Sequence, residues 1–284
     1  IKAERLHDKI KALKAQMKVL QRIETRLEAS PDKQISLTDP DARSMKTRGA
    51  GIVGYNVQTA VDTKHHLIVA HQVVNTGTDR DQLSAMAIKA RTAMSVDDLK
   101  VIADRGYFNS EEILACQEAG ITPIVPKVVT SGATAEGRFG KADFIYDTQT
   151  DEYRCPADQR LIWRFASIEH GLKLHRYWSS HCPQCAIKDK CTPSNYRRVT
   201  RWEHEAILDA MQARLDHAPD SMRIRRQTAE HPFGTIKSWM GSTHFLTKTL
   251  DRVRTEMSLH VLAYNLKRVM NLIGTGALIQ AMQA

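Results

Sequence analysis

Two acidic side chains in this 284-residue chain have neighbours of the kind that metal-dependent phosphate chemistry requires. Asp104 follows the apolar run Leu99–Ala103, which predicts that its carboxylate lies at the C-terminal end of a buried strand. Open α/β sheets place their ligands at such strand ends, and a carboxylate there can bind a divalent cation. The alternative is that Asp104 only closes a turn or caps the helix that begins near Ser110.

The second acidic candidate is Glu230, which lies among cations on a predicted helix. Spacings of 3, 4 and 7 residues place one carboxylate and three cations on one helical face: Arg223, Arg226, Glu230 and Lys237. Neighbouring cations favour the charged form of a carboxylate, and arginines can bind phosphate through paired donors. The alternative is an ordinary exposed Arg226–Glu230 pair. Pro232 predicts a kink or break just after Glu230.

A strand-end Asp followed by a helical Glu between Arg and Lys is typical of two-metal phosphoryl transfer, in which carboxylates hold two ions ~4 Å apart. The chain resembles the DDE transposases of bacterial insertion sequences in four segments: GYNVQTAVD at 54–62, ADRGYF at 103–108, R-x3-E-x6-K at 226–237 and LAYNLKR at 262–268. The resemblance implies a ribonuclease H-like mixed sheet with flanking helices. It also implies Mg²⁺- or Mn²⁺-dependent cleavage and transfer of DNA strands between element ends and a target, by a homo-oligomer on DNA.

The resemblance also assigns roles to single residues. Asp104 corresponds to the second acidic ligand of the family and Glu230 to the third. Arg226 and Lys237 correspond to DNA-contacting partners of that Glu. Arg223 stands where the family pattern usually has Tyr, and we include it among the candidate DNA contacts.

The first acidic ligand of the family has no clear counterpart. In similar proteins it lies on a strand ending in Asp-Gly, ahead of a helical linker like residues 2–29, whereas this chain begins at Ile1. Asp39 and Asp62 are the available substitutes, but Asp39 falls in DPDARSM, which resembles a separate family segment. We therefore expect a fragment without its first catalytic Asp. The alternative is a catalytically inactive DNA-binding remnant that keeps a zinc module.

Four of the five cysteines predict a structural Zn²⁺ site. Zinc takes four ligands tetrahedrally, and C-x2-C is a common ligand spacing; the candidates are Cys155, Cys182, Cys185 and Cys191, with His181 as a substitute for one of them. The alternative is four buried reduced thiols. Cys116 is predicted to be a core residue of a helix. An odd cysteine count without a secretory signal predicts reduced thiols in a cytoplasmic protein.

A basic patch follows the cysteines and consists of Arg197, Arg198 and Arg201, with Trp202 beside them. Arginines bind phosphate and aromatic rings stack on exposed bases, so the patch is a candidate DNA-binding surface. The alternative is a solvated face.

Hydrophobic periodicity predicts the elements that position these residues. An amphipathic helix over 2–29 is expected to pack on a partner helix or on the domain. The predicted strands are 34–38, 54–62, 67–74, 99–103 and 121–125, and the predicted helices are 81–92, 110–119, 221–240 and 250–273. We expect four regions: a helical linker (1–33), a first core part (34–125), a small β-rich insertion with the cysteines (126–220) and C-terminal core helices (221–284).

Composition narrows the class of protein. Apolar residues make up 42% and charged residues 26%, which excludes a disordered, collagen-like or purely coiled-coil chain. No apolar run reaches the ~18 residues that a membrane span needs, so no membrane partner is expected. The chain has 41 Lys and Arg against 32 Asp and Glu, a net charge of +9, which favours a polyanionic partner.

Overall fold

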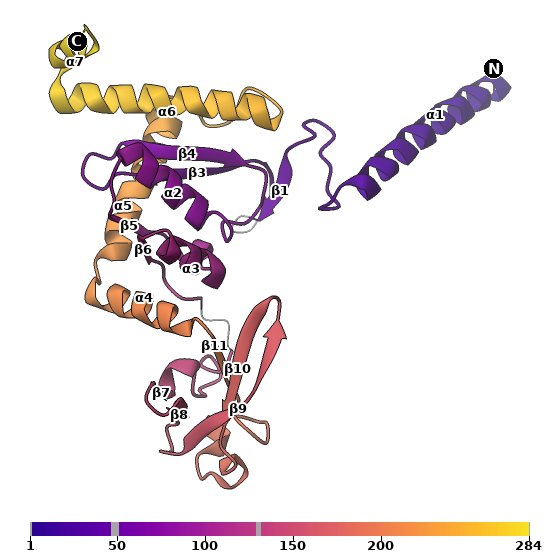
Figure 1. Cartoon of the computed structure of the whole chain (residues 1–284). Helices are drawn as coiled ribbons and strands as arrows, with labels where there is room; N and C mark the ends of the chain where they lie inside the picture. Colours follow the sequence, from indigo (N-terminus) through magenta and orange to yellow (C-terminus); the bar gives the residue numbers. More distant parts are fainter. Residues whose placement is uncertain (1, 47–50, 129–131, 284) are drawn as a thin grey trace. The chain divides into compact units, whose positions relative to one another are not determined.

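The computed structural model describes residues 2–46, 51–128 and 132–283, and the chain forms two compact units (Figure 1). Unit 1 comprises Ile1–Thr122 and Asp220–Ala284, and unit 2 comprises Pro123–Pro219. Unit 2 is therefore inserted into the chain of unit 1. Ile1, on which the expectation of a fragment partly rested, lies outside the described residues.

The first helix is confirmed as α1 (Lys2–Ala29). Its apolar stripe, which we expected to be covered, is exposed: Leu6 and Leu20 are each 60% exposed and Leu13 is 58% exposed. Charged residues on the remaining faces keep such a helix compatible with water.

The single mixed sheet that we expected is not formed by the described residues of unit 1. Instead there are three two-stranded sheets, and no ladder joins β3 to β5. Their members are β1 (Arg43–Lys46) with β2 (Gly51–Gly54), β3 (Asn56–Val61) with β4 (Ile68–Val74), and β5 (Leu99–Ile102) with β6 (Ile121–Ile124). The β3–β4 pair is the predicted antiparallel hairpin.

The strand predicted over 34–38 is wrong, because that segment is irregular. The Ser36 hydroxyl accepts the backbone N–H of Asp39 at 3.2 Å and lies 3.3 Å from the Thr38 hydroxyl. Side chains that bond to nearby backbone compete with a strand ladder. The first strand forms at Arg43–Lys46 instead.

Helices cover the hairpin of unit 1. α2 (Leu83–Met94) packs on β3 and β4, and α3 (Ser110–Glu118) packs on α2. α6 (Leu250–Ile273) lies along β4, and Figure 1 shows it running above the hairpin. The core between them contains Ile68, Val73, Ile236, Val253, Met257, Val261 and Tyr264.

The family-like segment LAYNLKR belongs to α6, and it holds the hairpin. The Asn265 side chain accepts the backbone N–H of Ile68 and donates to its carbonyl oxygen, both at 2.9 Å. The Tyr264 hydroxyl donates to the His66 carbonyl at 2.6 Å, and Arg268 Nε donates to the His65 carbonyl at 2.7 Å. The segment thus satisfies backbone groups at the turn between β3 and β4.

The helix predicted over 221–240 is present in two parts, α5 (Ser221–Gly234) and the π-helical turn η5 (Thr235–Trp239). The predicted break at Pro232 is wrong, because α5 continues to Gly234; Pro232 is buried, and the wider π turn follows it. Proline removes one backbone donor and crowds the preceding turn, and a π turn accommodates this distortion. α7 (Thr275–Gln283) ends the described chain. None of the described helices combines the length and apolar character that a bilayer span requires.

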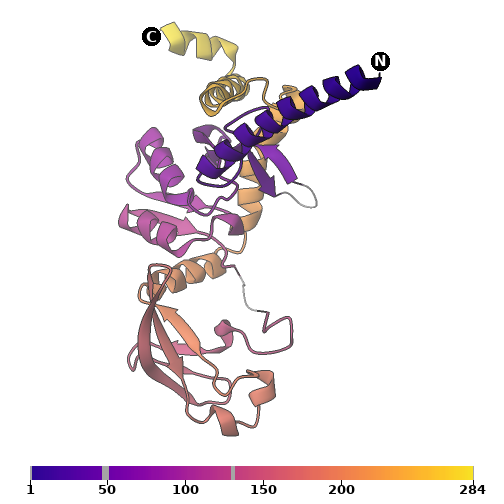
Figure 2. The same cartoon turned by 90° about the vertical axis from the view of Figure 1, so that its right-hand side faces the viewer.

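Unit 2 is built on a five-stranded sheet in the order β11-β10-β9-β8-β7, whose neighbours are all antiparallel. The strands are β7 (Ile145–Asp147), β8 (Glu152–Arg154), β9 (Arg160–Glu169), β10 (Leu172–Trp178) and β11 (Val199–Trp202). Figure 2 shows the long β9–β10 hairpin and the curl of this sheet. Its core contains Phe144, Tyr153, Leu161, Tyr177 and Val199, and α4 (Glu205–His217) follows the last strand.

Candidate functional site

Asp104 lies two residues past the end of β5, as its sequence context predicted. Its Oδ1 accepts the backbone N–H of Gly106 at 2.8 Å, so the carboxylate caps the short 3-10 helix η1 (Arg105–Tyr107). The helix that begins at Ser110 is capped by Asn109 instead. Asp104 therefore closes a turn and still has Oδ2 free for another partner.

That partner is Arg225, which sequence analysis did not select. Arg225 Nη2 donates to Asp104 Oδ2 at 2.7 Å. Its other terminal nitrogen, Nη1, lies 4.0 Å from Glu230 Oε1. One guanidinium thus brings together the two acidic residues that the sequence predicted as metal ligands. Figure 1 shows how this is possible: α5 runs beside both β3 and β5.

Arg225 reaches inward because of its place on α5. The buried residues Ser221, Thr228, Pro232 and Ile236 define the inner face of α5 and η5, and position 225 lies on the same stripe. Glu230 lies outside that face, with a side chain that is 66% exposed, so the guanidinium of Arg225 approaches it from the buried side of the helix. The Arg226–Glu230 pair that was the alternative interpretation is not formed among the described residues, and Glu230 approaches Arg225 instead.

The other predicted cations of this helix face solvent. Arg226 is exposed, and Arg223 is exposed and donates through Nε to Asp220 at 3.2 Å. Lys237 is exposed on η5, with its ammonium 5.9 Å from the centre of the Phe233 ring. These side chains are accessible to an anionic partner, while Arg225 is committed to the carboxylates.

A third carboxylate, Asp79, borders Asp104 and was also missed. A Cβ placed on Gly106 would lie 3.0 Å from Asp104 Oδ1 and 3.5 Å from Asp79 Oδ2. Asp79 Oδ1 accepts side-chain amide N–H groups of Asn56 and Gln58, each at 2.7 Å. Asp79 lies in a polar turn without hydrophobic periodicity, so the sequence carried no signal for its position.

A partly buried network of hydrogen bonds, centred on the buried Gln58, fixes this arrangement. The Tyr107 hydroxyl donates to the Gln58 side-chain oxygen, and the Gln58 amide donates to Asp79. Burial, followed by the charges of Asp79 and Asp104, raises the pKa of Tyr107, so the phenol keeps the proton that it donates. These hydrogen bonds connect β3 to the loop after β5. No strand ladder makes that connection in the described part of the molecule.

The two substitutes considered for a first acidic ligand are engaged elsewhere. Asp39 is 9% exposed and accepts the Tyr55 hydroxyl at 2.8 Å and the Thr249 backbone N–H at 3.2 Å. Asp62 accepts the backbone N–H of His65 at 2.6 Å and closes the β3–β4 turn. Neither contacts Asp104 or Glu230 among the described residues.

The residues of the basic patch lie in different environments within unit 2. Arg201 is 9% exposed, pairs with Asp209 at 3.0 Å and stacks over the Tyr146 ring at 3.7 Å, so its contacts are internal to the unit. Arg197 stacks over Phe144 at 5.2 Å. Arg198 is exposed and lies 5.5 Å from the centre of the Trp178 ring. Trp202 is buried.

All four cysteines of the predicted zinc site line one cavity of unit 2: Cys155, Cys182, Cys185 and Cys191. His181 borders the same cavity. Within residues 2–46, 51–128 and 132–283, however, no three Cys, His, Asp or Glu side chains stand together as a formed metal-binding group. Cys116 is fully buried in α3 of unit 1, as predicted for a core residue.

Comparison with known proteins gives one match. A family model described as a transposase DDE domain matches residues 25–266, which is most of the chain. No curated protein and no solved structure matches the chain.

Proposed function

The chain belongs to the DDE transposase family, and from this premise we propose that it cleaves and joins DNA strands at the ends of a bacterial insertion sequence. Transposases of this family act on DNA and generally use a divalent metal ion such as Mg²⁺. In our proposal Asp104 and Glu230 are two of the acidic ligands of a ribonuclease H-like core, and a homo-oligomer pairs the two element ends.

One observation carries this proposal. Asp104 follows a strand and Glu230 lies on a helix more than a hundred residues later, yet both carboxylates approach the guanidinium of Arg225. Both remain open to solvent, with side chains 41% and 66% exposed. A site that acts on a DNA phosphate needs acidic groups that are close together and still accessible.

The donors suit a hard divalent cation. Carboxylate oxygens are the ligands that Mg²⁺ and Mn²⁺ prefer, and the place between Asp104 and Glu230 already accommodates the positive charge of Arg225. Bound ions would activate the attacking oxygen and stabilise the leaving oxygen. Asp104 and Glu230 would hold them.

The chain's own residues supply positioning. The Gly106 N–H fixes one oxygen of Asp104, so the carboxylate keeps its orientation. The exposed side chains of Arg223, Arg226 and Lys237 lie on the same segment as Glu230 and would bind the phosphates that flank the reacting one. In unit 2 the exposed Arg198 is the most accessible candidate for a further phosphate contact, beside Arg197.

We further propose that the first catalytic Asp lies outside residues 1–284. The support is that Asp39 and Asp62 are engaged away from Asp104, while Asp79 is bound by two amide donors. The same observation favours a second candidate function, an inactive DNA-binding remnant, because the described residues then lack a complete acidic set.

The test uses the protein as its gene encodes it, including any residues translated ahead of Ile1. Its substrate is DNA that borders the gene, which would contain the element ends. We expect Mg²⁺-dependent strand cleavage that Asp104→Asn reduces at least about a hundredfold, since a metal ligand in a reacting site is lost, while DNA binding stays within about twofold.

The matched control is Asp98→Asn, which removes an exposed carboxylate just before β5 and should leave cleavage unchanged. Cleavage that survives Asp104→Asn would refute the role of Asp104. Binding to the same DNA without cleavage by the unaltered protein would favour the remnant.

A further inference from the structure

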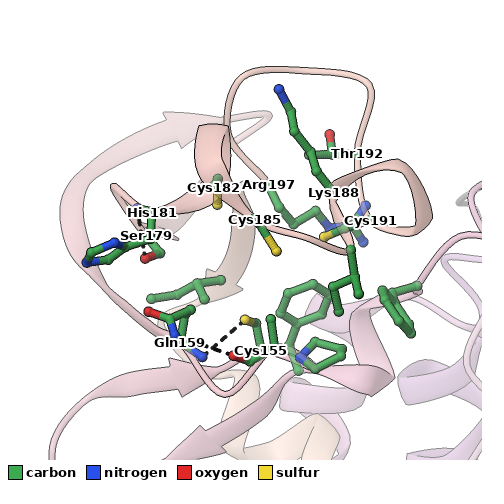
Figure 3. A pocket seen from close by; sticks show the side chains of 16 residues that line it. Cys155, Gln159, Ser179, His181, Cys182, Cys185, Lys188, Cys191, Thr192 and Arg197 are labelled. Atoms are coloured by element: carbon green, nitrogen blue, oxygen red, sulfur yellow. Dashed lines mark hydrogen bonds between the residues drawn. The ribbon is translucent and has the colours of Figure 1, made fainter.

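The cavity that the four cysteines share is small and partly open, and its lining suits a metal ion. Its volume is about 30 Å³, enough for one water-sized occupant and too small for an organic ligand. Apart from the thiols, much of its wall is apolar, including Phe139, Phe144 and Ile187. Figure 3 shows the sulfur atoms of the four cysteines around one central space, with the His181 ring to one side.

Each thiol is presented by a tight turn. Cys155 begins the turn between β8 and β9, where the Asp158 N–H donates to the Cys155 carbonyl at 2.8 Å. Asp158 has a φ of +57°, the left-handed conformation that such a turn requires. The backbone N–H of Gln159 then lies 3.4 Å from Cys155 Sγ. A backbone N–H directed at the sulfur orients it, as outer-shell hydrogen bonds orient the ligands of a metal.

The other three cysteines flank two short 3-10 helices. Cys182 starts η3 (Cys182–Gln184), and the Cys185 N–H donates to the Cys182 carbonyl at 3.3 Å. Cys191 follows η4 (Lys188–Lys190), and its N–H donates to the Lys188 carbonyl at 2.8 Å. The chain between residues 182 and 191 is therefore folded so that three thiols face the turn that carries Cys155.

An arginine whose Nε makes no hydrogen bond among the described residues borders the thiols. Arg197 lines the cavity, and its Nε is buried with no hydrogen-bond partner in the described part of the chain. Lys188 lines the same cavity. Four thiolates around Zn²⁺ carry a net charge of −2, so two neighbouring cations would compensate it.

We propose that Cys155, Cys182, Cys185 and Cys191 bind one structural Zn²⁺ ion and thereby fix the loop 182–198 to the β8–β9 turn. The four thiols line the cavity without standing together as a formed ligand group, and binding would bring them onto the ion. Each coordinating thiol releases its proton to solvent, and no electron is transferred. The site is separate from the carboxylates of unit 1, and its failure would leave the proposed transposase function untouched.

The experiment begins with the whole chain, purified under reducing conditions without chelator. Mass spectrometry of the metal content should give about one zinc per chain. After removal of the metal, titration with Co²⁺ should produce the intense sulfur-to-cobalt absorption and the visible bands of a tetrahedral tetrathiolate, and Zn²⁺ should displace them at one equivalent.

Single Cys→Ser variants at the four positions should each lose at least about tenfold in Zn²⁺ affinity, measured by competition with a chromogenic chelator. Cys116→Ser is the matched control, because Cys116 lies in unit 1, and it should keep one zinc per chain. His181→Ala should also keep it.

Three results would overturn the proposal. The first is folded protein with neither bound zinc nor a cobalt spectrum. The second is undiminished Zn²⁺ affinity in a variant of one of the four cysteines. The third is a mass 2 Da lower per cysteine pair in protein purified with reductant, which would reveal disulfides. The spectrum and metal content of the unaltered chain decide the matter even where a serine variant fails to fold.

Discussion

The two units each gather side chains that can hold a cation, but they use opposite chemistry. In unit 1 the groups are oxygens of Asp104 and Glu230, which are open to solvent and already share the guanidinium of Arg225. In unit 2 they are the sulfurs of cysteines around a small cavity with a largely apolar wall. Oxygen donors with open access suit an ion that meets a substrate, whereas a closed sulfur site suits an ion that holds structure.

The two groups of side chains also differ in the contacts that hold them in place. The carboxylates depend on a few long-range polar contacts, such as the hydrogen bonds that Gln58 of β3 makes with Asp79 and Tyr107 and the Asp104–Arg225 contact with α5. The thiols lie on short turns attached to a five-stranded sheet with an aromatic core. Reactive and structural sites should therefore respond differently to loss of core packing, loss of charge and a change of pH.

The largest effect is expected from Leu161→Ala in the core of unit 2. Leu161 is 1% exposed, and truncating such a side chain costs about 2–5 kcal/mol of folding free energy. Hydrogen exchange should show faster exchange in β8, β9 and β10, while the amides of residues 99–107 in unit 1 keep their protection.

The reciprocal control is Met257→Ala, which removes a buried side chain from the core of unit 1. It should lower protection in β4 and α6 and spare the sheet of unit 2. If either variant accelerated exchange in both units equally, the two units would unfold together, and the contrast between them would not hold.

A smaller effect is expected from Asp79→Asn. The Asn oxygen can still accept the amides of Asn56 and Gln58, so folding should change little, but one negative charge next to Asp104 is lost. Because that charge favours a cation at the site, we expect the Mg²⁺ concentration for half-maximal cleavage to rise roughly tenfold, with DNA affinity unchanged.

Asp81→Asn is the control for this change. Asp81 accepts the Asn109 side-chain amide at 3.0 Å, lies in the same polar turn and has no contact with Asp104 among the described residues. An equal shift in both variants would mean that Asp79 acts only through the general charge of the turn.

Arg225→Met should strengthen metal binding, whereas Asp79→Asn should weaken it. Its guanidinium competes with a metal ion for Asp104 and Glu230, although solvent weakens the contact with the exposed Glu230. Without it we expect Mn²⁺ to bind roughly threefold more tightly to protein free of DNA, as measured by calorimetry. Arg223→Met removes an equally charged side chain that is paired with Asp220 instead, and it should leave the Mn²⁺ affinity unchanged. Weaker Mn²⁺ binding in Arg225→Met would show that Arg225 positions the carboxylates.

The residues of the candidate site could be proposed from the sequence because their signals are local. The apolar run before Asp104 and the spacing around Glu230 each lie within one element, and so does the C-x2-C pair of unit 2. Arg225 was missed because the choice between two adjacent arginines depends on the rotation of α5 about its axis. The buried stripe of Ser221, Thr228 and Pro232 would have shown the inner face of that helix.

The fold, too, was predictable only where its signals lie within one segment of the sequence. Helices and the β3–β4 hairpin follow from periodicity, which is a property of neighbouring residues. Whether β3 joins β5 is a long-range matter, and the expected mixed sheet is replaced in the described residues by separate pairs. The link through Tyr107, Gln58 and Asp79 joins three segments that have no common sequence pattern.

The smallest expected effect is a loss of stability of unit 1 at acidic pH. Burial, and then the charge of Lys89 on α2, lowers the pKa of His71 on β4; Arg254 on α6 lines the same pocket. Above the ordinary histidine pKa of about 6.5 the ring is neutral in both folded and unfolded chains, so it adds no pH dependence. Below that value the unfolded chain takes up a proton more readily, and stability falls as the pH decreases.

We therefore expect the urea midpoint of unit 1 to fall between pH 7 and pH 5, and the fall to be smaller in His71→Gln. Glutamine can still bond to Ser258, which lies 3.0 Å from His71 Nε2, so the two proteins should have similar stability at pH 7. The profile is measured by hydrogen exchange of β4 at several urea concentrations. An unchanged slope in His71→Gln would assign the acid sensitivity of unit 1 to other groups, because only the titration of this ring differs between the two proteins.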